Sequence, residues 1–285
     1  MCMLMPQSDR IDSPAGLSGF KAKHYLFADA TRKQLELQVA VEVPVSFGYG
    51  GMPYAVMMAT PDDLRDFAYG FSLTEGVIQS VKDIRSVEIR RAEESITVEI
   101  TLSSDQFKSH LAKRRMMSGR TACGLCGIER LDDLPVADHV TKQASVIQPD
   151  AIHRALQSLE GVQSLNRLTR SVHAAAWCND KGEIIVLRED VGRHNALDKT
   201  IGHLLQKDIK AQAGFFVITS RASFEMVEKA ALFGAQTIVA VSAPTSLAIR
   251  RADALGVRLI AIARQDSMIE FTTGFRQAGE NSNHE

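Results

Sequence analysis

The chain has 285 residues, of which 45% are hydrophobic and 24% are charged, and its formal net charge is −1. This length suits one large domain or two smaller ones, and the composition is typical of a soluble globular protein. The near-zero charge argues against bulk binding of nucleic acid or of a membrane surface, and no apolar stretch reaches the roughly 18 residues that span a bilayer.

The two ends of the chain are polar and show no hydrophobic period. We expect residues 1–18 and 277–285 to be flexible tails. The start shows no basic region followed by a long apolar run, so no secretory signal is visible. With four cysteines and no such signal, the expected location is the reducing cytoplasm.

Residues 19–112 are predicted to form a small α+β domain. Residues 33–59 are predicted to be β structure, and apolar residues alternate there from Leu35 to Val45, which is typical of a half-buried strand. A helix is expected to begin at Thr60 as N-cap, because a proline and two aspartates follow it. The other predicted elements are a glycine turn at 48–51 and strands at 85–90 and 95–102.

Residues 136–276 are predicted to form an α/β domain. Short apolar strands alternate with helices, which implies a parallel sheet covered on both faces. Gly234 and Gly256 stand where helix C-caps are expected. The predicted strands start near 173, 183, 215, 237 and 257, and the predicted helices cover 149–160, the residues after Gly192, 222–233 and 244–255.

Polar residues follow four of these predicted strands. In open α/β sheets, ligands bind at the carboxyl ends of strands, where helix N-termini and arginines suit phosphates. We therefore expect an anionic, nucleotide-like ligand, with Glu189 or Asp190 holding a base or a ribose. The candidate residues are Asp190, Gly192, Arg193, His194, Ser220, Arg221, Ser242, Thr245 and Arg264.

Several of these candidates also have a structural interpretation. Ser220, Ser242 and Thr245 can be helix N-caps. Asp190 can form an ion pair with Arg193 or His194.

Cys123 and Cys126 form a C-x-x-C pair within residues 113–135, which we expect to be a mobile loop between the two domains. Glycines flank the pair and arginines precede it, and nearby positive charge favours the reactive thiolate. These two cysteines are the candidate catalytic residues. Cys178 lies within an apolar strand and is expected in the core.

The cysteine pair has three interpretations. A structural zinc site needs four ligands, and a second closely spaced pair is missing. A thioredoxin-type motif should follow a strand and open a helix, which this context does not favour. A sulfur carrier needs one nucleophilic cysteine, flexibility and a docking site for the acceptor. The residues favour this last interpretation only modestly.

Five segments, in one order from about residue 40 to about residue 250, resemble the formate dehydrogenase accessory sulfurtransferase (FdhD) family. Five long segments are far more specific than a lone C-x-x-C pair. They read V-M-M-A-T-P-D-D-L-R-D-F-A-Y-G-F-S-L-T-E-G, G-R-T-A-C-G-L-C-G-I-E, E-D-V-G-R-H-N-A-L-D-K, S-R-A-S-F-E-M-V-E-K and A-V-S-A-P-T-S-L-A.

The resemblance implies a cytoplasmic, homodimeric sulfur carrier. Such proteins accept sulfur from a cysteine desulfurase as a persulfide, on the position of Cys123. They pass it to the molybdenum of bis(molybdopterin guanine dinucleotide), which is then fitted into formate dehydrogenase. The resemblance also implies a three-layer α/β/α C-terminal domain similar to the cytidine deaminase fold. GDP is the expected surrogate ligand, because the cofactor carries guanine nucleotides.

The family's cofactor contact near the C-terminus falls on a segment where this chain departs from the family. The family usually reads Gly-Phe at the start, Arg at the end and then Tyr-Thr, whereas this chain has Ala261-Ile262, Ser267 and Phe271-Thr272. The implied contacts are Ile262, Ala263, Arg264, Gln265, Asp266 and Ser267. Two alternatives stay open: a cofactor-binding chaperone that carries no sulfur, and a thiol redox protein.

Overall fold

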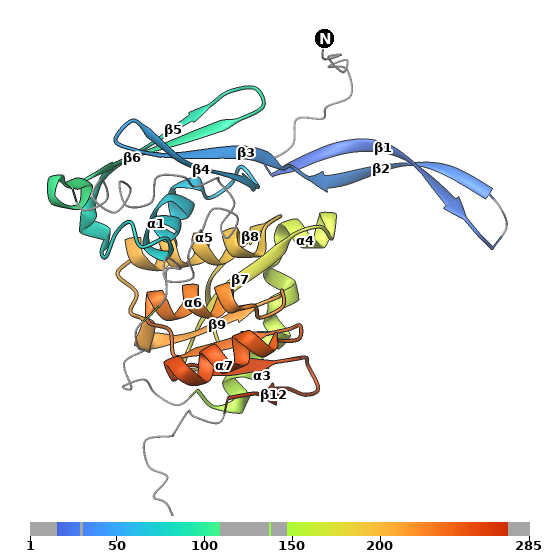
Figure 1. Ribbon diagram of the computed structural model, residues 1–285. Coiled ribbons are helices and arrows are strands. Elements are labelled where there is room, and N and C mark those ends of the chain that lie inside the picture. The colour runs from blue at the N-terminus through green and yellow to red at the C-terminus, as the bar shows by residue number, and fades with distance from the viewer. Residues whose placement is uncertain (1–15, 29–30, 109–136, 138–146, 273–285) are drawn as a thin grey trace, which may run out of the picture.

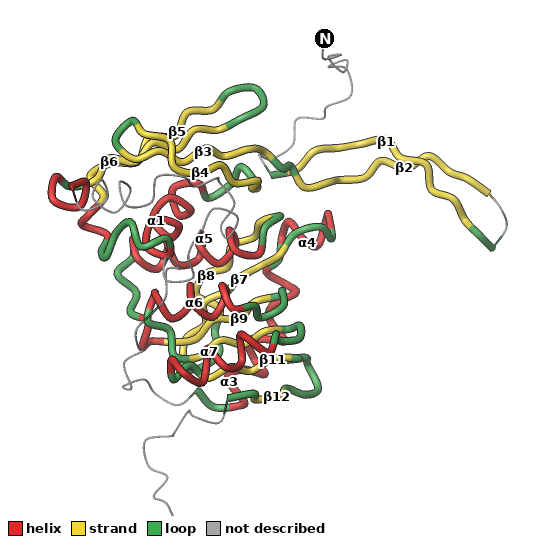
Figure 2. The backbone as a smooth tube through the Cα atoms, viewed as in Figure 1, coloured by secondary structure: helices red, strands yellow, loops and turns green. Residues whose placement is uncertain are grey.

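The computed structural model describes residues 16–28, 31–108, 137 and 147–272. They form a two-stranded ribbon, a four-stranded sheet and a six-stranded sheet, so the predicted α/β class is confirmed. Figures 1 and 2 show the four-stranded sheet at one end of the molecule and the six-stranded sheet toward the other, with helices α1 and α5 between them.

The first unit consists of the ribbon, the four-stranded sheet and helix α1. The sheet order is β4-β3-β6-β5, in which β3 and β6 run parallel. Helix α1 covers the inner face, where Phe67 and Phe71 pack at 4.9 and 4.7 Å from the ring of Phe47. The bounds are β1 Leu17–Leu26, β2 Thr31–Ala40, β3 Val43–Tyr49, β4 Met52–Ala59, α1 Leu64–Thr74, β5 Ile84–Arg91 and β6 Ile96–Leu102.

The alternating segment that predicts a half-buried strand is divided between β2 and β3. Only β3 buries its apolar side chains; in β2, Leu35 and Leu37 are 38% and 48% exposed. The half-buried prediction is therefore wrong for β2, because β2 pairs only with β1, in a ribbon outside the main sheets. Leu17 and Ser18, which the sequence assigns to a flexible tail, belong to β1.

Helix α1 begins at Leu64, after Asp63, whose φ of 54° lies in the left-handed region. The predicted N-cap at Thr60 is wrong, because a tertiary contact takes its side chain. The buried Thr60 hydroxyl donates to the Asp190 carboxylate at 2.9 Å, although 130 residues separate the two.

The second unit is built on a sheet of order β12-β11-β10-β9-β7-β8. Strands β9, β10 and β11 are parallel, whereas β7 is antiparallel to both β8 and β9. The predicted parallel sheet is thus correct only for the central strands β9, β10 and β11. Strands β7 and β8 are antiparallel because a short turn, closed by Gly182, joins them directly. The bounds are α3 Pro149–Val162, α4 Ser164–Thr169, β7 His173–Asn179, β8 Ile184–Asp190, α5 Arg193–Gln206, β9 Gly214–Ile218, α6 Phe224–Phe233, β10 Thr237–Ala240, α7 Ser246–Leu255, β11 Arg258–Ala261 and β12 Ile269–Glu270.

Helices cover both faces of this sheet, which confirms the three-layer arrangement. Successive strand residues point to opposite faces: Trp177 and Phe216 join the core with α5, α6 and α7, whereas Cys178 and Phe215 pack with α3. The likeness to the cytidine deaminase fold stays a prediction.

The two units share one apolar core. Helix α1 packs along α5, and the same cluster of buried residues holds Phe67 of the first unit and Leu197 of the second. The domain limits at 19–112 and 136–276 stay predictions. No helix in the described part of the chain is long and apolar enough to cross a membrane.

Candidate functional site

Cys123 and Cys126 lie outside the described residues. Cys178 is buried in β7, as predicted, and desolvation raises the pKa of its thiol to about 12. Such a thiol supplies almost no thiolate at neutral pH, so Cys178 is a core residue and not a nucleophile. Within residues 16–28, 31–108, 137 and 147–272, no three His, Cys, Asp or Glu side chains gather as metal ligands.

The carboxyl ends of β8, β9, β10 and β11 lie along one edge of the six-stranded sheet, which we call the strand-end edge. Strand β8 runs in the same direction as β9, because both are antiparallel to β7. Adjacent loops are linked by backbone hydrogen bonds, from Val241 to Ile218 (2.9 Å) and from Ile262 to Ser242 (3.1 Å). The structure thus brings the predicted candidates onto one edge, roughly 19 Å from β8 to β11 at about 4.8 Å per strand.

Asp190 lies at the end of β8 but is fully buried and does not face a ligand. One carboxylate oxygen accepts from the Gly192 N–H (2.8 Å) and the Asn195 amide (2.9 Å). The other accepts from Thr60 and from the ammonium of Lys199, at 2.5 Å. The predicted ion pair with Arg193 or His194 is therefore wrong, and the partner is Lys199.

The carboxylate of Glu189 also forms hydrogen bonds within the protein. Its carboxylate accepts from the N–H groups of Leu165 (2.8 Å) and Asn166 (2.7 Å) at the start of α4. Protein donors contact both carboxylates in this structure, and the expectation that Glu189 or Asp190 holds a base or a ribose stays a prediction. The Gly192 N–H is likewise taken, by Asp190.

A cluster of polar and charged side chains surrounds the starts of α5 and α6 at the strand-end edge. His194 contacts Glu225 at 2.6 Å, and the Nε of Arg193 and the Oγ of Ser223 are buried without a hydrogen-bond partner among the described residues. Burial lowers the pKa of His173, and the nearby Arg193 and His194 lower it further. The hydrogen bond from His194 lowers the pKa of Glu225. Helix N-termini with free donors suit an anion.

The predicted hydroxyl candidates have separate positions along the same edge. Thr245 is the N-cap of α7, where its hydroxyl accepts from the Ala248 N–H at 3.3 Å, so its structural interpretation is confirmed. Ser220 is buried and donates to the Arg221 carbonyl at 3.1 Å. Neither Ser220 nor Ser242 is an N-cap, since α6 and α7 begin after Ser223 and Thr245. Arg221 is exposed.

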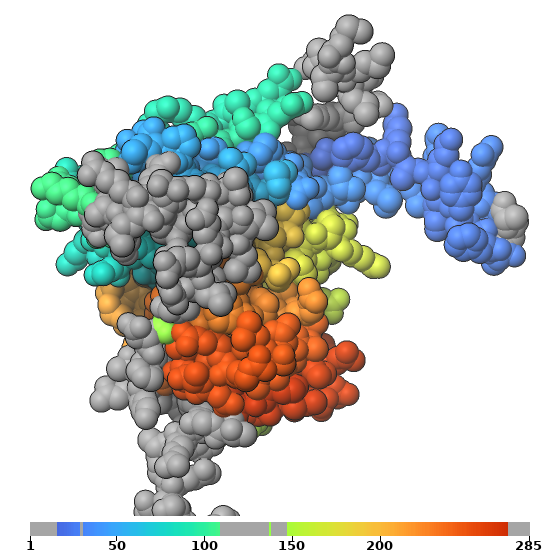
Figure 3. Space-filling model, in the orientation of Figure 1, coloured from blue at the N-terminus to red at the C-terminus, as the bar shows by residue number. Residues whose placement is uncertain are grey.

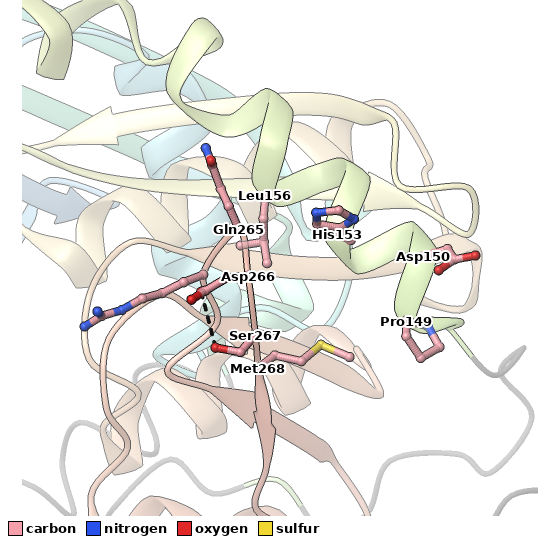
Figure 4. Close-up of a pocket in the computed structure, with 9 residues that line it drawn as sticks. Pro149, Asp150, His153, Leu156, Gln265, Asp266, Ser267 and Met268 are labelled. Atoms are coloured by element: carbon pink, nitrogen blue, oxygen red, sulfur yellow. Dashed lines mark hydrogen bonds between the residues drawn. The ribbon is translucent and has the colours of Figure 1, made fainter.

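A small pocket of about 210 Å³ lies between α3 and the loop after β11 (Figure 4). Figure 4 shows Asp150 and His153 on the helix and Gln265, Asp266 and Ser267 on the loop. The pocket is smaller than the roughly 300–1,000 Å³ typical of whole-ligand sites, so it suits part of a ligand. The lining residues are Pro149, Asp150, His153, Leu156, Arg264, Gln265, Asp266, Ser267 and Met268.

Two of the six predicted residues at 262–267 do not line this pocket. Ala263 is fully buried in the core against α3. Ile262 has a φ of 51°, which is strained for a β-branched residue and turns the chain away from β11. Strain of this kind is concentrated at ligand sites.

Sequence reasoning missed several residues of this region. The α3 side of the pocket was missed because α3 covers the face opposite α5, α6 and α7, away from the helices that follow the strands. The buried pairing of Lys199 was predictable from the sequence. Lys199 lies one helical turn after Asn195, and a lysine on the buried side of a helix requires a partner. The contact of Thr60 was not predictable, because only the tertiary fold brings it to Asp190.

Three comparisons connect this chain to known proteins. Residues 40–277 match the model of the FdhD/NarQ family. A sulfur carrier protein FdhD from Variovorax paradoxus is 44% identical over 241 residues, which are 85% of this chain and 87% of that protein. Another from Agrobacterium fabrum is 43% identical over 242 residues, 85% of this chain and 89% of that protein.

A solved structure shares the fold. It is a putative formate dehydrogenase accessory protein from Desulfotalea psychrophila, with a TM-score of 0.67 and 24% identity, and the match covers 90% of this chain and 97% of that one. At this identity the comparison establishes the fold alone.

Proposed function

Because this chain belongs to the FdhD/NarQ family, we propose that it is a sulfur carrier for formate dehydrogenase maturation. It accepts sulfur on Cys123 from a cysteine desulfurase and passes it to the molybdenum of bis(molybdopterin guanine dinucleotide), which is its substrate. The cytoplasmic location and the homodimer belong to the same proposal. The match over residues 40–277 carries it, since two relatives at 43–44% identity are named as sulfur carriers.

The strand-end edge supports the binding of this substrate. The substrate's two guanine nucleotides carry diphosphates, and the starts of α5 and α6 present unpartnered donors from Arg193 and Ser223. The pocket between α3 and residues 264–268 lies beyond the end of β11, with room for a smaller part of the substrate. The edge is long enough for both regions to contact one extended ligand.

Sulfur enters by a balanced exchange at Cys123. Its thiolate attacks the outer sulfur of the donor's persulfide, the donor's S–S bond breaks, and the donor cysteine leaves as a thiolate. A persulfide remains on Cys123. Attack of the Cys126 thiolate on the inner sulfur of Cys123 then forms a Cys123–Cys126 disulfide and expels sulfide for the metal, so the two cysteines supply the two electrons.

Intact-mass measurement tests the proposal after incubation with a cysteine desulfurase and cysteine. The wild-type protein should gain the mass of one sulfur, and Cys123→Ala should not. Cys126→Ser should load sulfur but release it only after a thiol reductant is added. If the protein binds the cofactor but Cys123 gains no sulfur, the alternative of a chaperone that carries no sulfur is supported. If a Cys123–Cys126 disulfide forms and no persulfide is detected, the alternative of a thiol redox protein is supported.

A further inference from the structure

Helices α6 and α7 hold a buried ion pair between them. They pack side by side on the face of the six-stranded sheet that is turned toward the viewer in Figures 1 and 3. The Glu228 carboxylate of α6 is almost fully buried and accepts a hydrogen bond from the Nε of Arg251 on α7. Because a buried carboxylate is costly unless its oxygens have donors, the other oxygen of Glu228 needs a partner as well.

Ala137 supplies that partner. Its N–H donates to the second oxygen of Glu228 at 2.9 Å, and its carbonyl accepts from the guanidinium of Arg251 at 2.7 Å. Its methyl group is buried in the same apolar core as Met226 of α6 and Leu255 of α7. Two side chains from two helices thus hold both backbone groups of one residue, as a neighbouring strand would. We call Glu228 and Arg251, with these contacts, the Ala137 clamp.

The clamp decides on which face of the sheet the chain is held after the cysteine pair. Cys123 and Cys126 precede Ala137 in the sequence. After Ala137, the next described residue is Ile147, which packs with α3 on the opposite face and whose carbonyl accepts from Arg258 at 2.7 Å. Without the clamp, the first residue held after the cysteines, among those described, would be Ile147 on the face of α3.

The clamp also lies close to the strand-end edge. Glu228 comes four residues after the start of α6, and Arg251 comes five residues after the start of α7. At about 1.5 Å per residue, these positions are roughly 6–8 Å along their helices from the two starts, where Ser223 and Thr245 lie. The clamped residue is therefore about one helical turn from the candidate site.

We propose that Glu228 and Arg251 are positioning residues for the sulfur transfer: by clamping Ala137, they hold the cysteine pair to the face of α6 and α7. The assignment rests on the proposed function for the role of the cysteines. Cys126 lies 11 residues before Ala137 and 21 before Ile147, and an extended chain spans at most about 3.6 Å per residue. The clamp therefore restricts Cys126 to roughly 40 Å from its anchor, against roughly 75 Å for an anchor at Ile147.

Spin labels on Cys123 and on Leu247→Cys test this assignment in the full chain, through the distances that double electron–electron resonance measures between them. Leu247 is 49% exposed near the start of α7. Cys2→Ser and Cys126→Ser remove the other reactive thiols, whereas Cys178 is buried and stays. With the clamp intact, the distances should form a confined distribution.

Two variants open the clamp from opposite sides. Glu228→Met with Arg251→Met replaces the ion pair by apolar side chains, which usually preserves the fold, and it should lengthen and broaden the distances. Ala137→Pro removes the donated N–H, leaves the pair between α6 and α7 intact, and should do the same. Arg258→Met with Glu270→Met is the matched control: it removes the ion pair (2.8 Å) that holds the chain on the α3 face and should leave the distances unchanged.

Unchanged distances in either clamp variant would overturn the proposal, since Glu228 and Arg251 would then only join two helices. An equal change in the control would overturn it too, because the change would not be specific to the clamp.

Both clamp variants should still gain one sulfur on Cys123 but activate formate dehydrogenase at least about tenfold more slowly, because a misplaced reacting group lowers the rate. Normal activation despite longer distances would overturn the positioning role. The distance measurement requires no sulfur donor, so the clamp and the proposed sulfur transfer can each fail alone.

Discussion

Gly70 of α1 and Gly202 of α5 face each other where the two helices cross. A Cβ atom on Gly70 would lie 1.7 Å from the carbonyl oxygen of Asp198, and one on Gly202 would lie 1.8 Å from that of Asp66. Both obstacles are backbone, which cannot move without displacing a helix. Glycine is therefore required at both positions for the two units to share a core.

Gly70→Ala should destabilise the protein by about 3 kcal/mol or more, because the added methyl group forces α1 away from α5. Urea denaturation measures the loss. Gly161→Ala is the matched control: this glycine lies in α3 with nothing within 4 Å of an added Cβ. It should be neutral or stabilise by up to about 1 kcal/mol through helix propensity. Equal effects at both positions would show that the crossing is not tightly packed.

Lys199→Met should destabilise the protein by about 3–5 kcal/mol, because it leaves the buried Asp190 carboxylate without its cation. All the hydrogen bonds of the Lys199 ammonium are buried, to Asp190 and to the hydroxyl and carbonyl of Thr60. Lys210→Met removes a pair with Asp208 that is exposed on both sides, and it should cost under about 1 kcal/mol. Similar denaturation midpoints for the two variants would contradict a structural role of the buried pair.

His173 should make stability fall as the pH decreases. Its pKa is lowered in the folded protein, first by burial and then by Arg193 and His194, so below about pH 6.5 the unfolded state binds more protons. The contribution of neutral His173 to the free energy of unfolding is fully present above that pH, and it is lost as the pH falls through the folded pKa. His173→Gln should reduce this loss as the pH falls below about 6.5, measured by urea midpoints.

NMR titration provides the direct check on His173. Arg193→Ala should raise the pKa of His173, since it removes one nearby positive charge. An anion bound at the starts of α5 and α6 should raise it as well. An unchanged pKa in both experiments would place Arg193 and the anion away from this histidine.

GDP should bind the strand-end edge, and Arg193→Ala or Arg221→Ala should weaken its binding roughly ten- to a hundredfold through a lost charge-assisted hydrogen bond. Calorimetry measures the affinities. Arg85→Ala, on the separate four-stranded sheet, is the control and should bind GDP as the wild type does. Equal affinities for all three variants would place the nucleotide elsewhere, and equally tight adenine nucleotides would remove the case for guanine specificity.

Local features of this protein were predictable from the sequence. Gly234 and Gly256 end their helices in the left-handed region at φ of 94° and 73°, because only a residue without a side chain adopts it readily. Short apolar strands indicated the three-layer unit, and the polar residues after four strands converge on one edge as expected. These features depend on neighbours a few residues apart.

The tertiary structure decided which side chains remain available to a ligand. Asp190 and Glu189 stand at the end of a strand, where ligand contacts are expected, yet Thr60, Lys199 and the start of α4 occupy their oxygens. The sequence also did not predict that the apolar face of β2 is exposed or that α3 forms one side of the pocket. The physical reason is that the spacing of apolar residues in the sequence indicates only that one face of an element is suited to burial. Which segment packs on that face depends on contacts between residues far apart in the chain.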